Sequence, residues 1–294
     1  MSSTRSHTAK PARARPSRRP LRPAAAPAAR GASPEHSRAA EHLESLDKGL
    51  RVLELFGSGE AANLAMIDVA GRLDMPRAVA RRVLLTLERL GYLRSDGRRY
   101  ALAPRVLTLG YTYLASLGFR AVAKPVLDSL AESTGRPCSV GVLDGMDVVY
   151  VLRSEARRLV RIDLAVGSRI PAWVNSMGRL LLSGLDPAGL DQRLAGLQPA
   201  RLTRHTVTDK RKLKQRILDA GRQGWCYIAD EVEEGIRGIA APLHDADGRL
   251  IAATNMSLAF HERSETGLRR KLLPLLLEKT RSIEEILRSG MRPS

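Results

Sequence analysis

The hydrophobic and polar positions between residues 66 and 102 follow the order helix, short turn, helix and hairpin. Apolar residues in 66–73 recur at i, i+3, i+4 and i+7, which forms one helical stripe. A second stripe spans 76–90, and Gly91 follows as a residue common just past a helix end. Asp96-Gly97 between two short apolar runs is a strong hairpin signal. This order predicts a winged helix-turn-helix.

The second helix of this motif carries a basic face opposite its apolar stripe. Small and basic side chains fit the major groove of DNA, where arginine binds guanine edges or phosphates. The hairpin adds three arginines suited to flanking phosphates or the minor groove. The alternative is a solvated basic face on an ordinary helical hairpin, but the basic wing favours double-stranded DNA as the partner. The predicted DNA-binding residues are Arg77, Ala78, Val79, Arg81, Arg82, Thr86, Arg94, Arg98 and Arg99.

Two further helices are predicted around this motif. Residues 45–56 have helical spacing of apolar positions with Ser45 as the N-cap, and they supply the third helix of the DNA-binding domain. Residues 104–117 are apolar on more than one face, and such a helix must be covered on more than one face. We therefore predict a linker helix held between the DNA-binding domain and a second body, which we take to be a partner subunit.

After residue 119 the pattern changes to a mixture of helices and strands. Strand-like runs and amphipathic runs follow each other without strict strand–helix–strand alternation, which is typical of an α+β domain. The predicted helices span residues 121–134, 177–185, 190–197, 209–223 and 264–287. The predicted strands span residues 139–143, 148–152, 159–166, 225–230, 236–243 and 250–258.

The N-terminal segment differs in composition from the rest of the chain. Residues 1–42 are rich in Ala, Pro, Arg and Ser and have almost no large apolar residues, so burial cannot offset the entropy of ordering them. We predict a disordered basic tail, which is either a non-specific DNA arm or a solubilising leader. The remaining predicted segments are a DNA-binding domain (43–103), the linker helix (104–118) and a second domain (119–290).

Composition narrows the classes of function. The formal net charge of +17 favours a polyanionic partner, and an aromatic content of 4% argues against platforms that stack single-stranded bases. Cys138 and Cys226 lie far apart and no zinc-site spacing occurs, so we expect two buried thiols, no metal and no cofactor. No apolar run is as long as a membrane span, and Arg18-Arg19 do not precede an apolar core segment. We predict a cytoplasmic protein without a membrane partner.

Two stretches of the second domain are candidates for ligand binding. In residues 170–179 a loop leads into a helix, where Asn175 and Ser176 can cap and free amides attract carboxylates. Trp173 can form the wall of a pocket for a flat ligand. Residues 230–237 form a loop with four acids and one arginine.

Polar residues also alternate along the last predicted strand. Asn255 and Ser257 are two positions apart and therefore share one sheet face. The structural alternatives remain open, because a helix cap is usually only a cap and an acidic loop is usually only solvated. Arg237 would then be a salt-bridge partner of the acids before it.

Five segments between roughly residues 45 and 290 resemble the IclR family of transcriptional regulators. They are SLDKGLRVLELF, RAVARRVLLTLERLGYL, RRYALAPRVLTLGYTYLAS, IPAWVNSMGRLLLSGL and DEVEEGIRGIAAPLHDADGRLIAATNMS. The run from Pro104 to Tyr111 is the most specific, followed by the helix start at Met177-Gly178-Arg179 and the loop at Gly235-Ile236-Arg237. Within the family the chain is most similar to regulators of the protocatechuate, 4-hydroxybenzoate and β-ketoadipate pathways.

This resemblance implies a fold class of α+β, with an N-terminal winged helix-turn-helix and a C-terminal GAF-like mixed α/β effector-binding domain. It implies homodimers or homotetramers on promoter DNA, with RNA polymerase as a further partner. It also implies a small carboxylic-acid effector, aromatic or dicarboxylic. The expected function is a ligand-responsive regulator of a catabolic operon for aromatic compounds. The sequence leaves open the effector, the operator and the choice between activation and repression.

The resemblance also implies an effector pocket. Five positions match pocket positions of the family, two match a nearby acidic stretch, and four come from the residue pattern. The predicted effector-binding residues are Arg161, Trp173, Asn175, Ser176, Met177, Asp230, Glu231, Arg237, Gly238, Asn255 and Ser257. Val79 replaces a small hydroxyl residue of the family's recognition helix, and Gly238 replaces a bulkier pocket residue and thus enlarges the pocket.

Two other functions are weighed against this one. An enzyme acting on small acids is disfavoured, because the sequence has no G-x-S-x-G, H-E-x-x-H or P-loop motif. An architectural DNA-binding protein without a ligand would leave a large, well-patterned second domain without a role. We therefore predict a regulator and no catalytic residues.

Overall fold

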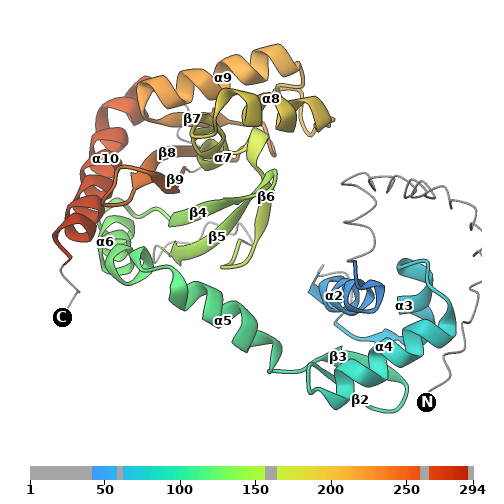
Figure 1. The fold of residues 1–294 in the computed structure, drawn as a ribbon. Helices are drawn as coiled ribbons and strands as arrows, with labels where there is room; N and C mark the ends of the chain where they lie inside the picture. Colours follow the sequence, from blue (N-terminus) through green and yellow to red (C-terminus); the bar gives the residue numbers. More distant parts are fainter. Residues whose placement is uncertain (1–41, 58–61, 156–163, 259–264, 291–294) are drawn as a thin grey trace, which may run out of the picture. The chain divides into compact units, whose positions relative to one another are not determined.

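The computed structural model describes residues 42–57, 62–155, 164–258 and 265–290. The chain divides into two compact units, Met1–Ala103 and Pro104–Ser294 (Figure 1). Each cluster of buried apolar side chains lies within one unit, so each unit is built around its own core.

The first unit has three helices around a common core among its described residues. They are α2 (Glu44–Gly57), α3 (Met66–Arg72) and α4 (Arg77–Arg89). Val52, Val69 and Leu84, one from each helix, are fully buried together. A tight turn with Asp74 at a φ of +47° joins α3 to α4. Two helices, a short turn and a strand hairpin follow each other as predicted, which confirms the winged helix-turn-helix.

The wing contains one strand more than the predicted hairpin. β2 (Leu93–Ser95) and β3 (Arg99–Leu102) pair antiparallel, and β1 (Leu64–Ala65) joins the other side of β3. β1 has only two residues, which is too short for the alternation that identifies a strand in a sequence. Gly97 at the tip of the hairpin has a φ of +91°, which a residue with a side chain rarely adopts.

Two predicted helix starts in this unit are wrong by one residue. α2 begins at Glu44, so Ser45 lies in its first turn and is not its N-cap. The carbonyl of Leu43 already accepts the N–H groups of Leu46 and Asp47, which places the helix start before Ser45. Pro76 is the N-cap of α4 and not its first helical residue. Proline suits the N-cap as well as the first helical position, because neither position needs the backbone N–H group that proline lacks.

The second unit is built on an antiparallel sheet with the strand order β6-β5-β4-β9-β8-β7 (Figure 1). The strands are β4 (Cys138–Asp144), β5 (Asp147–Ser154), β6 (Arg169–Pro171), β7 (Cys226–Ala229), β8 (Arg237–His244) and β9 (Leu250–Leu258). The helices are α5 (Val106–Ser116), α6 (Phe119–Thr134), α7 (Ser176–Ser183), α8 (Pro187–Gly196), α9 (Lys210–Gln223) and α10 (Glu265–Ser289). A 3₁₀ turn, η1 (Ala172–Val174), precedes α7. The α+β class is confirmed.

Helices cover both faces of this sheet. α6 and α10 pack on one face, where Leu127, Ile239 and Leu276 are fully buried. η1, α7, α8 and α9 belong to the core on the other face, where Met177, Leu213 and Ala240 are fully buried. A residue of the sheet therefore faces one of two separate helical layers, and its strand register decides which.

One predicted strand of the second unit is wrong at its C-terminal end, which is the only part of it that the structure describes. Of the predicted strand 159–166, residues 164–166 lie outside any strand, and the rest falls outside the described residues. On the side away from β4, β5 pairs with β6, which begins only at Arg169. β6 is short and ends in Pro171, so its sequence shows no clear alternation.

The linker helix α5 is apolar and exposed. None of its residues is buried, and Leu107 and Tyr111 are 74% and 72% exposed. Within the part of the chain that the structure describes, no single helix has the length and apolarity to cross a membrane. Only α5 and α6 taken together reach that measure, and they are bent by 87° where they meet.

Candidate DNA interface and effector site

The exposed face of α4 carries the predicted DNA-binding cations. Arg77, Arg81 and Arg82 are exposed, as are Ala78 and Thr86. Among the described residues no acidic group pairs with these three arginines, so their charge is available to a polyanion. Such a face, on the second helix of a helix-turn-helix, has the form that enters a major groove.

Val79 is the exception among the predicted residues of α4. It is half-buried and packs against the core of the first unit. Two residues turn a helix by about 200°, so Val79 points away from Arg77 and toward the core of the first unit. The Thr86 hydroxyl donates to the Arg82 carbonyl at 2.7 Å, which leaves the hydroxyl oxygen exposed.

The wing holds its three arginines at the surface. Arg94, Arg98 and Arg99 are all exposed, and Arg99 Nη1 also donates to the Asn63 carbonyl at 3.3 Å. The Asp96 carboxylate accepts the backbone N–H groups of Arg99 (2.7 Å) and Arg98 (2.8 Å). These two backbone hydrogen bonds lower the pKa of Asp96, and the one from Arg99 has the larger effect. A carboxylate thus fixes the turn that presents the basic tip.

The second candidate site lies at the start of α7. Asn175 is its N-cap, and the Asn175 side-chain oxygen accepts the N–H groups of Met177 (2.9 Å) and Gly178 (3.3 Å). Asn175 Nδ2 donates to the Tyr150 hydroxyl at 3.3 Å. Burial raises the pKa of Tyr150, so this hydroxyl stays protonated. The predicted capping role of Asn175 is therefore present, and its amide is committed to the protein itself.

Three polar side chains form a row across the sheet face beneath α7. Ser139 of β4 pairs with Arg153 of β5 on one side and with Asn255 of β9 on the other. Directly opposed residues of antiparallel strands project to the same face. Asn255 lies near α7, because a Cβ added to Gly238 would be 3.5 Å from Asn255 Nδ2 and 3.3 Å from Ser176 Oγ. We call Arg153, Ser139 and Asn255 the polar row.

Each member of the polar row has a buried atom without a hydrogen-bond partner among the described residues. These atoms are Arg153 Nη1, Ser139 Oγ and Asn255 Oδ1. The Arg153 side chain is 5% exposed, and its Nε pairs with Glu155. An unsatisfied buried polar group costs about 1–3 kcal/mol, and more when it is charged. The row therefore offers a cation, a hydroxyl and an amide oxygen to a polar ligand.

Four of the predicted effector residues lie around this row. Ser176 begins α7, Gly238 faces it from β8, and Ser257 is paired with Gly238 across β8 and β9. Met177 is fully buried, and a Cβ added to Gly141 of β4 would be 3.1 Å from its methyl group. The start of α7 is thus seated directly on the sheet.

Three other predicted effector residues are committed elsewhere. Asp230 and Arg237 form an ion pair of 2.9 Å, so the structural alternative for Arg237 is the one observed. Arg237 also alternates with Gly238 along β8, which directs it to the opposite sheet face. Glu231 forms a buried ion pair of 2.6 Å with Arg179. These acids hold the loop between β7 and β8 in place.

Trp173 and Arg161 complete the predicted set. Trp173 is 5% exposed and belongs to the core between the sheet and α7, and its carbonyl accepts from Arg179 Nε at 2.9 Å. Arg161 lies outside the described residues. Cys138 and Cys226 are free and buried, as expected, and burial raises the pKa of each to about 12.

Sequence reasoning missed Arg153 and Ser139. Alternation along β5 would place Arg153 on the face opposite Tyr150, but the β4–β5 register shifts between Val140 and Gly141. Val151 is the extra residue on β5, and both it and Leu152 pack toward α6 and α10. Arg153 therefore returns to the face of Tyr150. Only an arginine within an otherwise apolar strand was visible in the sequence.

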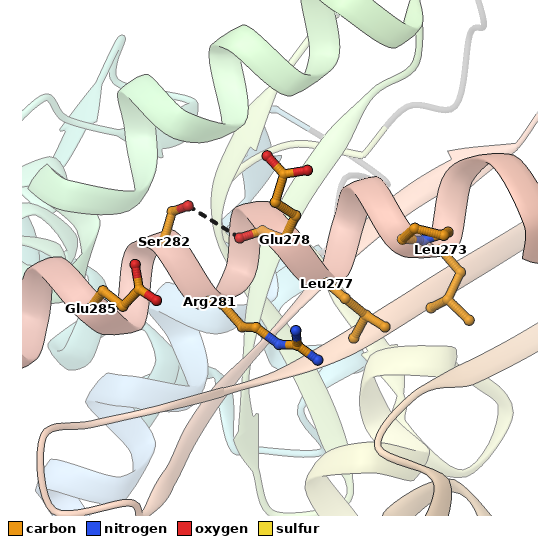
Figure 2. A pocket seen from close by; sticks show the side chains of 7 residues that line it. Leu273, Leu277, Glu278, Arg281, Ser282 and Glu285 are labelled. Carbon is orange, nitrogen blue, oxygen red and sulfur yellow. Dashed lines mark hydrogen bonds between the residues drawn. The ribbon is translucent and has the colours of Figure 1, made fainter.

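A separate groove of about 520 Å³ follows α10 (Figure 2). It is lined by Leu273, Pro274, Leu277, Glu278, Arg281, Ser282 and Glu285. None of these is a predicted effector residue, and the Ser282 hydroxyl is bonded to the Glu278 carbonyl at 3.2 Å. Across the described ranges, no group of three His, Cys, Asp or Glu side chains is arranged to hold a metal ion.

Comparison with known proteins gives a consistent result for both units. The family model for the C-terminal domain of bacterial IclR transcriptional regulators matches residues 111–285, and the IclR helix-turn-helix model matches residues 45–97. The chain is 37% identical over 244 residues to the Pca regulon regulatory protein of Pseudomonas putida, covering 83% of this chain and 84% of that protein.

Solved structures agree with this result. A transcriptional regulator from Rhodococcus sp. RHA1 is 39% identical, with a TM-score of 0.74 over 85% of this chain and 100% of that chain. An IclR homologue from Microbacterium hydrocarbonoxydans, crystallised with 4-hydroxybenzoate, is 26% identical, with a TM-score of 0.72 over 84% of this chain and 100% of that chain. These proteins are regulators, which points away from an enzyme. The chain is a member of the IclR family of bacterial transcriptional regulators.

Proposed function

We propose that this chain regulates an operon for the catabolism of aromatic acids and that an aromatic hydroxy acid is its effector. The exposed arginines of α4 and the wing bind operator DNA, and the effector binds at the polar row. The complex of an IclR homologue with 4-hydroxybenzoate supports this class of ligand. The proposal keeps the predicted division into a tail (1–42), a DNA-binding domain (43–103), a linker helix (104–118) and an effector domain (119–290).

The buried and partly unsatisfied guanidinium of Arg153 carries this proposal. Arginine presents a planar fork that matches a carboxylate, and charge-assisted bonds are about twice as strong as neutral ones. Ser139, directly opposite Arg153 on β4, can donate to the same carboxylate. A carboxylate bound here would satisfy atoms that have no hydrogen-bond partner among the described residues.

The other end of the site is neutral. Asn255 and Ser176 supply an amide and a hydroxyl, and Gly238 contributes no side chain. These groups suit a hydroxyl group better than a second carboxylate, because Arg179, the arginine of α7, is already paired with Glu231. A monocarboxylic acid with a distal hydroxyl therefore fits better than a dicarboxylic acid.

Thermal unfolding with a panel of acids tests the effector. A ligand at about a hundred times its Kd should add roughly 2.7 kcal/mol to the free energy of unfolding. We expect 4-hydroxybenzoate or protocatechuate to raise the Tm, and β-ketoadipate to raise it less. An unchanged Tm with every acid would contradict the proposed ligand class.

A matched pair of variants tests the site. Arg153→Met removes the proposed carboxylate partner and should abolish the rise in Tm. Arg222→Met removes the same charge from an exposed position on α9 and should leave the rise intact. An equal response of the two variants would place the acid elsewhere.

The exposed apolar face of α5 supports a homo-oligomer as part of the proposal. Leu107, Leu109, Tyr111 and Tyr113 are 74%, 53%, 72% and 47% exposed. Leucine and tyrosine so exposed on one helix are typical of an interface. Sedimentation of Leu107→Glu/Tyr111→Glu should show a smaller species than the wild type, and an unchanged sedimentation coefficient would contradict this interface.

A further inference from the structure

A buried ion pair joins α7 to the loop between β7 and β8. Arg179 Nη1 lies 3.0 Å from Glu231 Oε1, and Arg179 Nη2 lies 2.6 Å from Glu231 Oε2. The two side chains are 3% and 11% exposed. The contact is therefore a two-pronged, charge-assisted pair that is shielded from solvent.

The same pair connects two further segments. Arg179 Nε donates to the Trp173 carbonyl at 2.9 Å, which ties η1 to the guanidinium. Glu231 Oε2 accepts the Val207 N–H at 3.3 Å, and the Glu231 carbonyl accepts the Thr206 hydroxyl at 2.7 Å. Four segments therefore meet at one pair: η1, α7, residues 206–207 and the loop between β7 and β8.

The turn before α7 has little freedom to move against the helix. A Cβ added to Gly178 would lie 2.2 Å from the Ala172 carbonyl oxygen, so η1 and the first turn of α7 are in close contact. Asn175 and Ser176 lie between these two fixed points. Whatever holds Trp173 and Arg179 therefore also sets the position of Ser176 over Gly238.

Stability alone does not account for such a pair. Removing two charges from water costs several kcal/mol, and apolar replacements of similar size are often neutral or stabilising. Geometric control does account for it, because the fork of arginine fixes both distance and angle. The pair would thereby set the separation between Ser176 and Gly238. This separation is small, because Ser176 Oγ is only 3.3 Å from the position that a Cβ of residue 238 would take.

We propose that Arg179 and Glu231 are positioning residues for effector binding: they hold the turn at Asn175 and Ser176 in register with the polar row. This inference rests on the proposed effector site. The pair does not contact the ligand; it acts through Trp173 and the first turn of α7. Loss of the pair lowers effector affinity in a protein that remains folded.

Glu231→Gln tests the inference, with Glu284→Gln as its matched control. Both carboxylates are 11% exposed, and Glu284 pairs with His244 Nδ1 at 2.7 Å on the opposite face of the sheet. We expect the Kd for 4-hydroxybenzoate to rise about tenfold in Glu231→Gln, equivalent to about 1.4 kcal/mol. The Kd should remain within about twofold of wild type in Glu284→Gln, even if both variants unfold at a lower temperature.

A second variant covers the case in which Glu231→Gln does not fold. Arg179→Met/Glu231→Leu replaces the pair with apolar groups, which usually retain stability. The same rise in Kd is expected there, because the tie to Trp173 is lost. Wild-type Kd in either folded variant would overturn the inference.

Hydrogen exchange separates this inference from the proposed function. Amides of residues 173–178 should exchange faster in the double variant without any ligand, whereas those of β9 should not. If the wild type binds no acid but the amides of residues 173–178 exchange faster in the double variant, the proposed effector is wrong and the positioning role of the pair is supported. If exchange in 173–178 matches wild type, the positioning role fails.

Discussion

The DNA-binding face and the polar row of this protein are built in opposite ways. The first comes from residues 77–99, close together in sequence, whose arginines are exposed. The second comes from residues 139, 153 and 255 on three strands, and its polar atoms are buried. An exposed arginine without a partner is solvated by water and hardly changes the free energy of folding. A buried arginine with an unsatisfied nitrogen destabilises the folded state. A buried arginine with an unsatisfied nitrogen, such as Arg153 Nη1, is therefore the stronger indication of a ligand.

The largest effect should come from the exposed arginines. Arg81→Ala/Arg82→Ala removes two cations from the face of α4, which has no acidic partner within the described ranges. We expect operator affinity to fall by about 1–3 kcal/mol per arginine. The Tm should change little, because neither side chain is part of the core. Fluorescence anisotropy with operator DNA measures the loss.

A control for this variant lies in the other unit. Arg222→Ala removes an exposed arginine of α9 and should leave operator affinity within about twofold of wild type. If all three substitutions weaken binding equally, only overall charge matters and α4 is not the recognition helix. The response of the Tm to 4-hydroxybenzoate should be unchanged in every one of these variants.

Two asparagines test the buried site with a smaller effect. The Asn175 oxygen caps α7, so Asn175→Ala should lower the free energy of unfolding by about 0.5–2 kcal/mol. Asn255 Oδ1 has no partner among the described residues, so Asn255→Ala should not lower the Tm. Asn255→Ala should instead raise the Kd for the effector several-fold.

Urea unfolding and calorimetric titration of both variants measure these quantities. The two asparagine variants should behave in opposite ways: Asn175→Ala should lower the free energy of unfolding, and Asn255→Ala should raise the Kd for the effector. If Asn255→Ala unfolds as readily as Asn175→Ala, the amide of Asn255 serves the fold. This result would contradict the proposal that the polar row binds a ligand.

Sequence periodicity predicted most of the fold because most elements are long and locally patterned. The strand Leu250–Leu258 was predicted to the residue, and α9 differs from its prediction only in that Asp209 is its N-cap. β1 and β6 were missed because two or three residues cannot show a period. Ser45 was misplaced because a serine one residue inside a helix looks the same as a cap.

The residues of the proposed effector site were predicted only in part, for a different reason. Ser176, Gly238 and Asn255 were found through a family resemblance, and the structure places them together. Arg153 was missed because a bulge at Val151 reverses the alternation of β5. Glu231 was assigned to the ligand through the family resemblance, and its pairing with Arg179 could not be foreseen because the two residues are distant in sequence. The position of Arg153 depends on strand register, and the pairing of Glu231 depends on a residue distant in sequence. Neither can be deduced from the periodicity of apolar residues.

The wing should contribute through salt dependence more than through specificity. Arg98 is exposed at the hairpin tip and has no acidic partner among the residues described here. Arg98→Gln should reduce the slope of log K against log salt by about 0.9, the value of one phosphate contact on duplex DNA. Discrimination between operator and unrelated DNA should stay the same. An unchanged slope would show that the tip does not reach a phosphate.

The smallest effect concerns how the wing is held. The N–H groups of Arg99 and Arg98 lower the pKa of Asp96, so its carboxylate holds the turn at every pH above the ordinary aspartate value of about 3.9. The turn is lost only as the pH falls through the lowered pKa of the folded protein. Amide chemical shifts of Arg98 and Arg99 should therefore titrate below that ordinary value. In Asp96→Asn the side-chain oxygen still accepts, so these shifts should not titrate in acid. Titration of the wild type at the ordinary value would mean that the carboxylate does not restrain the wing.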